Sequence, residues 1–243
     1  MIRQWSIEYD TQVGESIKRN EHVRALALSS DHKWIISGES KLASVWNRHT
    51  WKKVLRVQDR TLEVEAADFS PESTKFATGA RDKKAFIWDI STGRRLLGPL
   101  EHDDNVVTVK FSPDGGHIAT ATWNRECLRV YSAHTGQLIR TISVKALGLC
   151  AMAWSSDSQR IFASSLNIKH IYVDTGTVII QWTITGDSNN AHASLAMPSN
   201  GRFVAGFVGS SVSLMDASSG LRFGPVFEHP GKNLRSIALS LDN

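Results

Sequence analysis

Short runs of alternating apolar and polar residues, separated by turn-forming residues, recur along the whole chain. The clearest set lies in residues 63–104, EVEAADFSPESTKFATGARDKKAFIWDISTGRRLLGPLEHDD. Four strand-like runs, at 64–69, 75–79, 84–89 and 95–100, are divided by Ser-Pro-Glu, Asp-Lys and Ser-Thr-Gly segments that favour turns. The pattern therefore predicts one small antiparallel sheet of four strands.

The same unit repeats along the sequence with a nearly constant period. The acidic or amide residue of the first turn recurs with steps of 41, 42, 43, 43 and 42, at Asp31, Glu72, Asp114, Asp157, Asn200 and Asp242. The large residue that ends the third strand recurs with steps of 41, 42, 43, 41 and 43, at Trp5, Trp46, Trp88, Tyr131, Tyr172 and Met215. One such sheet cannot bury both of its faces, but a ring of sheets can, so the period predicts a propeller.

We interpret residues 1–243 as a single domain that contains complete and partial units. Complete units are predicted at 21–62, 63–104, 105–147, 148–190 and 191–232, and partial units at 1–20 and 233–243. Residues 1–20 correspond to a third and a fourth strand, and residues 234–239 to a first strand. The expected fold is therefore all-β, with five complete four-stranded blades and a partial blade at each end.

Three short segments of the clearest unit carry a resemblance to a known family. Ile87-Trp88-Asp89, the following Thr92-Gly93 and the turn at residues 69–72, Phe-Ser-Pro-Glu, resemble the WD-repeat β-propeller family, including its divergent fungal arrays. The resemblance covers nearly the whole chain. It implies a rigid ring that binds proteins. Because propellers of this family often have seven blades, the start and stop within a repeat predict a fragment of a longer chain, with a six-bladed ring closed by the two ends as the alternative.

The resemblance also assigns a structural role to several polar residues. In that family each blade buries a hydrogen-bond chain that links a His before the first strand, a Ser or Thr, an Asp and a Trp. The matching positions are Thr78, Asp82 and Trp88 in one unit and His102, Thr120, Asn124 and Tyr131 in the next. Asn124 and Tyr131 replace Asp and Trp, and Arg60 or a neighbour stands where the first of these units would have its His.

A partner-binding surface is expected on the turns that join second and third strands, the rim that this family uses for partners. Trp123 and Arg125 are the candidate anchors, with Arg81 and Lys83 in the equivalent turn, because aromatic and Arg side chains dominate binding hot spots. Glu39, Lys41 and Asp103 are expected on the same rim, so its charge is mixed. The alternative is that Trp123 packs over the neighbouring blade. The remaining repeated tryptophans are interpreted as core residues: Trp5, Trp46, Trp88 and Trp154.

Composition narrows the classes of partner. The chain has 28 basic and 24 acidic residues, a net charge of +4, and no long basic run, which disfavours nucleic-acid binding. No segment approaches the roughly 20 apolar residues that span a bilayer, so no membrane association is expected. Cys127 and Cys150 are expected to be buried, reduced thiols. We therefore expect an intracellular protein in the cytoplasm, with the nucleus as the alternative.

No motif predicts chemistry. The nine histidines lack the close spacing of a zinc site, and nucleophile-elbow, phosphate-loop and dinucleotide motifs do not occur. The sequence therefore predicts no catalytic residue, cofactor or metal, and favours a non-catalytic protein–protein interaction scaffold. The alternatives are a propeller-type hydrolase or lactonase with a central-channel site, the sensor region of a larger fungal NTPase-type signalling receptor, and a nucleic-acid assembly factor.

Overall fold

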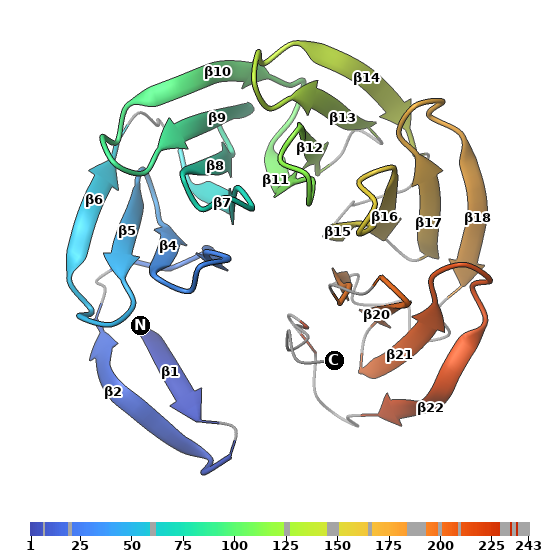
Figure 1. Ribbon diagram of the computed structural model, residues 1–243, viewed down its shortest axis with the longest axis horizontal. Helices are drawn as coiled ribbons and strands as arrows, with labels where there is room; N and C mark the ends of the chain where they lie inside the picture. Colours follow the sequence, from blue (N-terminus) through green and yellow to red (C-terminus); the bar gives the residue numbers. More distant parts are fainter. Residues whose placement is uncertain are drawn as a thin grey trace.

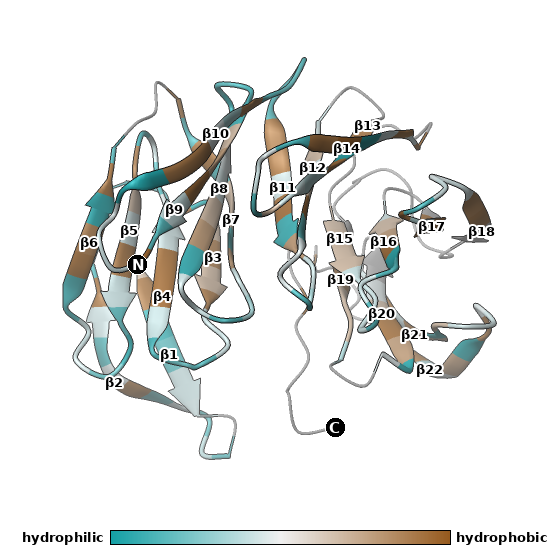
Figure 2. Cartoon of the chain, turned by 45° about the horizontal axis from the view of Figure 1, so that its top comes forward, coloured by the Kyte–Doolittle hydropathy of each residue, from teal (hydrophilic) through white to brown (hydrophobic). Residues whose placement is uncertain are grey.

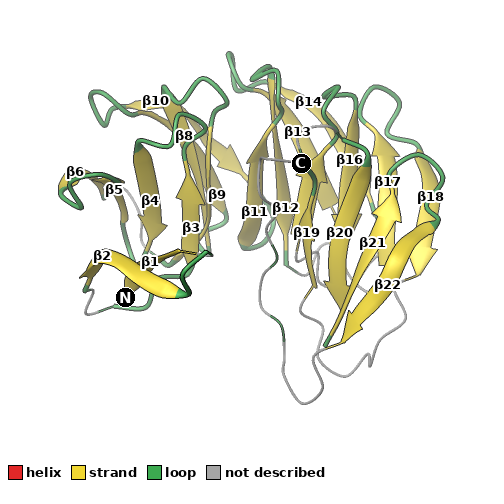
Figure 3. Ribbon diagram, turned by 60° about the horizontal axis from the view of Figure 1, so that its bottom comes forward, coloured by secondary structure: helices red, strands yellow, loops and turns green. Residues whose placement is uncertain are grey.

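The chain folds into strands and tight turns. The computed structural model describes residues 1–6, 8–18, 21–58, 62–123, 127–144, 151–164, 167–183, 193–198, 201–208, 210–228, 234 and 237. Within these ranges no residue is helical (Figure 3). The same ranges accordingly contain no helix with the length and apolar character needed to span a membrane.

The described strands form one two-stranded sheet and five four-stranded antiparallel sheets, here called blades. The two-stranded sheet pairs β1 (Ile2–Ser6) with β2 (Thr11–Ile17). The blades consist of β3 (Ala25–Leu28), β4 (Trp34–Gly38), β5 (Ala43–Asn47) and β6 (Lys53–Val57); β7 (Val64–Phe69), β8 (Lys75–Ala80), β9 (Lys84–Asp89) and β10 (Arg95–Glu101); β11 (Val106–Phe111), β12 (His117–Thr122), β13 (Cys127–Ser132) and β14 (Leu138–Ser143); β15 (Ala151–Trp154), β16 (Arg160–Ser164), β17 (Asn167–Tyr172) and β18 (Val178–Thr183); and β19 (Ala193–Ala196), β20 (Phe203–Val208), β21 (Ser211–Asp216) and β22 (Arg222–Glu228).

The blades stand side by side around a common centre (Figure 1). In every blade neighbouring strands pair in sequence order, with the first strand innermost and the fourth outermost. The β1–β2 sheet lies at one end of the resulting arc and the β19–β22 blade at the other. The predicted all-β propeller with five complete blades is therefore confirmed. The first strand predicted at 234–239 lies outside the described residues, apart from Leu234 and Ile237.

Strand register explains why a large residue recurs near the end of the third strand. That residue is buried and lies opposite a buried residue of the second strand, as in the pairs Ile35↔Trp46, Phe76↔Trp88 and Ile118↔Tyr131. In the fourth blade the slot belongs to Ile171, which pairs with Ile161, and not to Tyr172. Side chains alternate between the two faces of a strand, so this one-residue shift leaves Tyr172 37% exposed.

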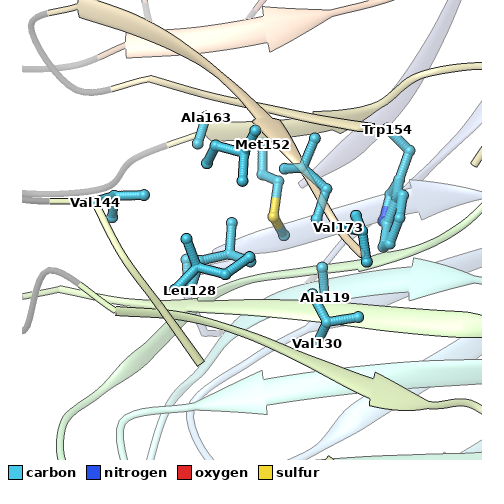
Figure 4. Packing of buried hydrophobic residues seen from close by; sticks show 12 residues of the cluster. Ala119, Leu128, Val130, Val144, Met152, Trp154, Ala163 and Val173 are labelled. Carbon is cyan, nitrogen blue, oxygen red and sulfur yellow. The ribbon is translucent and has the colours of Figure 1, made fainter. Parts of the chain in front are cut away.

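The hydrophobic core lies between blades. Figure 4 shows one such layer, in which Leu128 and Val130 of β13 pack toward Met152 and Trp154 of β15. In Figure 2 the brown, hydrophobic stretches follow the strands, whereas the turns between them are mostly teal or white. Trp154 is only 6% exposed, as the sequence predicts. Each blade therefore hides its apolar faces on its neighbours.

Trp5 departs from the predicted pattern. Its side chain is 54% exposed, so the expectation that it lies in the core is wrong. The reason is local. Among the described strands β1 pairs only with β2, so the position that the second strand of a blade would occupy, opposite Trp5, is not covered by a described strand.

Small residues allow neighbouring blades to approach closely. A Cβ atom added at Gly79 would lie 2.6 Å from Cγ1 of Val106 in the next blade, and one added at Gly38 would lie 2.8 Å from Cγ1 of Val64. These separations are shorter than van der Waals contact, so the two glycines act as sockets for the valines that begin the following blades.

Polar contacts also join adjacent blades near the centre of the arc. Asp68 of β7 accepts hydrogen bonds from the Lys110 ammonium (2.8 Å) and from the Phe111 backbone N–H (2.9 Å) of β11. The Lys110 carbonyl in turn accepts a hydrogen bond from the Trp154 indole at 3.1 Å. The inner strands of three successive blades are thus connected by side chains.

Candidate interaction surface

The turns that join second and third strands bring the predicted anchors to equivalent corners of neighbouring blades. The backbone N–H of Arg81 bonds the carbonyl of Glu63 at 3.0 Å, and that of Trp123 bonds the carbonyl of Asn105 at 3.1 Å. Both members of the second pair lie 42 residues beyond those of the first. Trp123 therefore occupies the slot of Arg81, one blade further along.

The side chain of Trp123 is 45% exposed, so nearly half of it remains accessible. Lys83 is also exposed, and its φ of +65° holds the turn in the left-handed region. Arg125, the second predicted anchor, and Asn124 lie outside the described residues.

Arg81 has a different environment from the one expected. Its guanidinium pairs with Glu63 at 2.8 Å and with Glu65 at 2.6 Å. Arg24, which precedes the neighbouring blade, pairs with the same two carboxylates at 3.1 and 3.6 Å. Because both carboxylates are shared, Arg81 belongs to an ion-pair network between two blades and is not a free cation for a partner.

Glu39 was expected on the exposed rim, and this expectation is wrong. Its side chain is 0% exposed and accepts a hydrogen bond from the Ser37 hydroxyl at 3.1 Å. The Ser37 oxygen in turn accepts the Trp46 indole N–H at 2.9 Å. The backbone N–H of Glu39 donates to the carbonyl of Leu42, so Glu39 begins a tight turn. The side chain of Glu39 faces inward from this turn.

The next blade contains the same indole contact. The Trp88 indole N–H donates to Thr78 Oγ1 at 2.9 Å, and both residues are buried. Asp82 accepts the backbone N–H of Lys84 at 3.2 Å and so supports the turn into β9. Residues 59–61, where a histidine would stand in the family pattern, lie outside the described residues.

Asp82→Ala is expected to lower the free energy of unfolding by about 1–3 kcal/mol, because the partly buried backbone N–H of Lys84 loses its acceptor. Asp82→Asn is the matched control, since its amide oxygen can still accept the Lys84 N–H. Urea denaturation followed by circular dichroism gives the comparison. An alanine variant as stable as the asparagine variant would contradict the role of Asp82 as an acceptor.

His102, Thr120 and Tyr131 form the polar chain of the third complete blade. His102 Nδ1 lies 2.9 Å from the Leu100 carbonyl, and Nε2 lies 2.7 Å from Thr120 Oγ1 and 3.4 Å from the Tyr131 hydroxyl. A carbonyl only accepts, so Nδ1 carries the proton and Nε2 accepts from Thr120. Burial lowers the pKa of His102 to about 4, although the bond to Leu100 opposes this shift. The imidazole is therefore neutral near pH 7.

The Ser37–Glu39–Trp46 cluster could have been found from the sequence. Ser37 lies 41 residues before Thr78 and Trp46 lies 42 residues before Trp88, which are the repeat steps themselves. The burial of Glu39 could not have been predicted from the sequence. A carboxylate is rarely fully buried without a partner, so a glutamate in a turn is expected to be exposed.

The described residues contain no group of three or more His, Cys, Asp or Glu side chains that could hold a metal ion. The side chain of Cys127 and the whole of Cys150 lie outside the described part of the chain, so the expected buried thiols stay a prediction.

Comparison with known proteins adds one finding. The family model described as WD domain, G-beta repeat, matches residues 14–47, 52–89 and 94–128. A search of curated protein sequences gives no match. Repeats of this family generally mediate protein–protein interactions and are typically non-enzymatic. The matched segments run from β2 into β13, and the two later blades repeat the same strand order. Three segments of the chain, within residues 14–128, are therefore WD repeats, and the repeated four-stranded sheets are consistent with a WD-repeat propeller.

Proposed function

We propose that the chain is a non-catalytic scaffold that docks a protein or peptide partner on the rim formed by the turns between second and third strands. The exposure of Trp123 carries this proposal. A tryptophan that is 45% exposed, with its backbone fixed to Asn105, offers a large and rigid aromatic surface. Such side chains commonly anchor binding interfaces.

The charges near Trp123 support a protein partner. Lys83 is exposed, while Asp103, in the loop between β10 and β11, forms an ion pair with Arg129 of the neighbouring blade at 2.7 Å. Nucleic-acid surfaces instead concentrate many Lys and Arg side chains that neutralise phosphates. A rim of mixed sign suits the mixed surface of a protein.

The described inner strands do not favour the hydrolase alternative. Asp68 has the position of a possible channel acid, but its carboxylate already bonds Lys110 and the Phe111 backbone. These contacts give it a structural task, joining two blades.

The rim is tested with the variant Trp123→Ala combined with Lys83→Ala. Proteins captured by the wild-type chain are identified by cross-linking mass spectrometry, and the affinity of a purified partner is then measured directly. We expect Kd to rise at least about tenfold, because the loss of an aromatic anchor costs more than about 1.4 kcal/mol.

Tyr9→Ala serves as the control, because Tyr9 is 70% exposed in the turn between β1 and β2, away from the rim. The control should keep wild-type affinity, and both proteins should keep the wild-type melting temperature. Equal affinity of the rim variant and the control would reject this assignment of the docking surface.

A further inference from the structure

The outermost strands of the first three complete blades concentrate positive charge. These strands, β6, β10 and β14, follow one another along the convex outside of the arc (Figure 1). With the residues that lead into them they comprise residues 52–57, 94–101 and 137–143, here called the outer wall. The outer wall contains six Lys and Arg residues and one carboxylate, that of Glu101, although the whole chain is nearly balanced, with 28 basic and 24 acidic residues. The basic excess of the chain is therefore local.

Neighbouring outer strands join into one surface. A Cβ atom added at Gly93, in the turn that precedes β10, would collide with the side chain of Leu55 in β6. One added at Gly136, in the turn that precedes β14, would lie 3.8 Å from Cβ of Leu97 in β10. Each of these outer strands therefore begins against the outer strand of the preceding blade, so their cations belong to a common surface.

Three cations of the outer wall are available to a partner. Lys52, Arg56 and Arg94 are exposed. None of the described carboxylates forms an ion pair with any of them. A partner that carries carboxylates would complement these side chains.

Two further cations are positioned by aromatic rings of their own blades. The Lys53 ammonium lies 5.1 Å from the centre of the Trp46 ring, and the Arg95 guanidinium lies 5.2 Å from that of Phe86. Such contacts hold a cation over the ring. The positive charge is therefore anchored at the start of both β6 and β10.

Exposed aliphatic residues lie among these cations. Val54, Leu96 and Ile139 are 50, 45 and 44% exposed. Each is an extra residue in the register between the third and the outer strand of its blade, which is a β-bulge. Bulges disturb a strand edge, and Pro99 of β10 has no N–H, so both features oppose the addition of a further strand. A partner is therefore recognised by side chains of the outer wall and not by its backbone.

The shape and composition of the outer wall favour a polypeptide over the other anionic partners. Strands β6, β10 and β14 contain no aromatic residue, the side chain on which unpaired bases stack. The surface is convex, so a flat bilayer would touch only part of it (Figure 1). A flexible chain segment can instead follow the curve across several blades.

We propose that the outer wall binds a flexible acidic segment of a partner protein in which carboxylates are interspersed with aliphatic residues. The carboxylates pair with Lys52, Arg56 and Arg94, and the aliphatic side chains pack on Val54 and Leu96. This surface is separate from the rim around Trp123 and does not depend on it.

The probe is a fluorescently labelled peptide with the sequence EDLEDLEDLEDL. Anisotropy measurements with the full chain should give saturable binding with a Kd below about 1 mM. Binding should weaken as salt is added, because the cations are exposed. Replacement of the leucines by serine, in EDSEDSEDSEDS, should raise Kd at least about threefold, since apolar contacts with the bulged residues are lost.

The protein variant that tests the location combines Arg56→Glu with Arg94→Glu, and it should raise the Kd of the leucine peptide at least about tenfold. The matched control combines Lys83→Glu with Arg222→Glu, which changes the net charge equally at exposed positions on the rim and on β22. The control should bind like the wild type, and both variants should keep the wild-type melting temperature. Absence of saturable binding, equal weakening in the two variants, or equal binding of the two peptides would overturn the proposal.

The other classes of partner are tested in parallel with phosphatidylcholine vesicles that contain about 30% phosphatidylserine, and with a single-stranded RNA. Neither should lose affinity selectively in the Arg56→Glu, Arg94→Glu variant. If vesicles or RNA bind through these two arginines and the peptide does not, the outer wall serves that partner and the proposal is overturned.

Discussion

Phe76→Ala is expected to lower the free energy of unfolding by about 4 kcal/mol, the cost of emptying a fully buried aromatic site. Phe76 is 0% exposed and stacks on Trp88 with ring centroids 6.2 Å apart, while Phe69 meets its edge at 6.3 Å. These rings belong to the core shared by the β3–β6 and β7–β10 blades. The substitution therefore weakens a seam between blades as well as one blade.

Urea denaturation of Phe76→Ala is compared with that of Phe223→Ala, whose side chain is 65% exposed on β22. The control should change stability by less than about 0.5 kcal/mol. Similar losses in the two variants would show that the seam around Phe76 does not limit stability.

Acid is expected to destabilise the protein through His102. The unfolded pKa is near 6.5 and the folded pKa is about 4, so between these values the unfolded chain binds the proton more strongly. The stabilising effect of the neutral imidazole is fully present above pH 6.5 and is lost as the pH falls toward 4. A shift of this size corresponds to about 3 kcal/mol.

The experiment follows the free energy of unfolding between pH 7 and pH 4 for the wild type and for His102→Gln, which does not titrate. Burial also lowers the pKa of His170, so some acid sensitivity should remain in the variant. The wild type should show the steeper loss. Parallel pH profiles would contradict a depressed pKa for His102.

The periodicity of the sequence was sufficient to predict the blades. The turn acids and the third-strand residues recur at the same steps, and the fold places Trp46, Trp88 and Tyr131 in one repeated buried slot. The prediction of burial from the period failed where the neighbouring strand that would cover the residue is not present in the described structure. Trp5 occupies the right position, but its burial depends on a second strand that β1 does not pair with in the described structure.

Side-chain partners at the rim were harder to predict than strands. Arg81 and Trp123 share a slot and both are exposed, yet Arg81 is held by ion pairs with Glu63 and Glu65 that its sequence position does not indicate. Glu63 and Glu65 lie 16 to 18 residues from Arg81 in sequence and also pair with Arg24 beside the neighbouring blade, so no local sequence pattern predicts this network. Glu39 shows the same limit, because its burial follows from the turn geometry and from Ser37.

The glycine sockets have a consequence for how this array can evolve. Gly38 receives Val64 and Gly79 receives Val106, so each of these two units fits the one that follows it. Both sockets receive a valine, so a bulkier residue at position 64 or 106 would find no spare room against the glycine of the preceding unit. Substitutions at the glycine of one unit and at the valine of the next are therefore coupled across these two boundaries between blades.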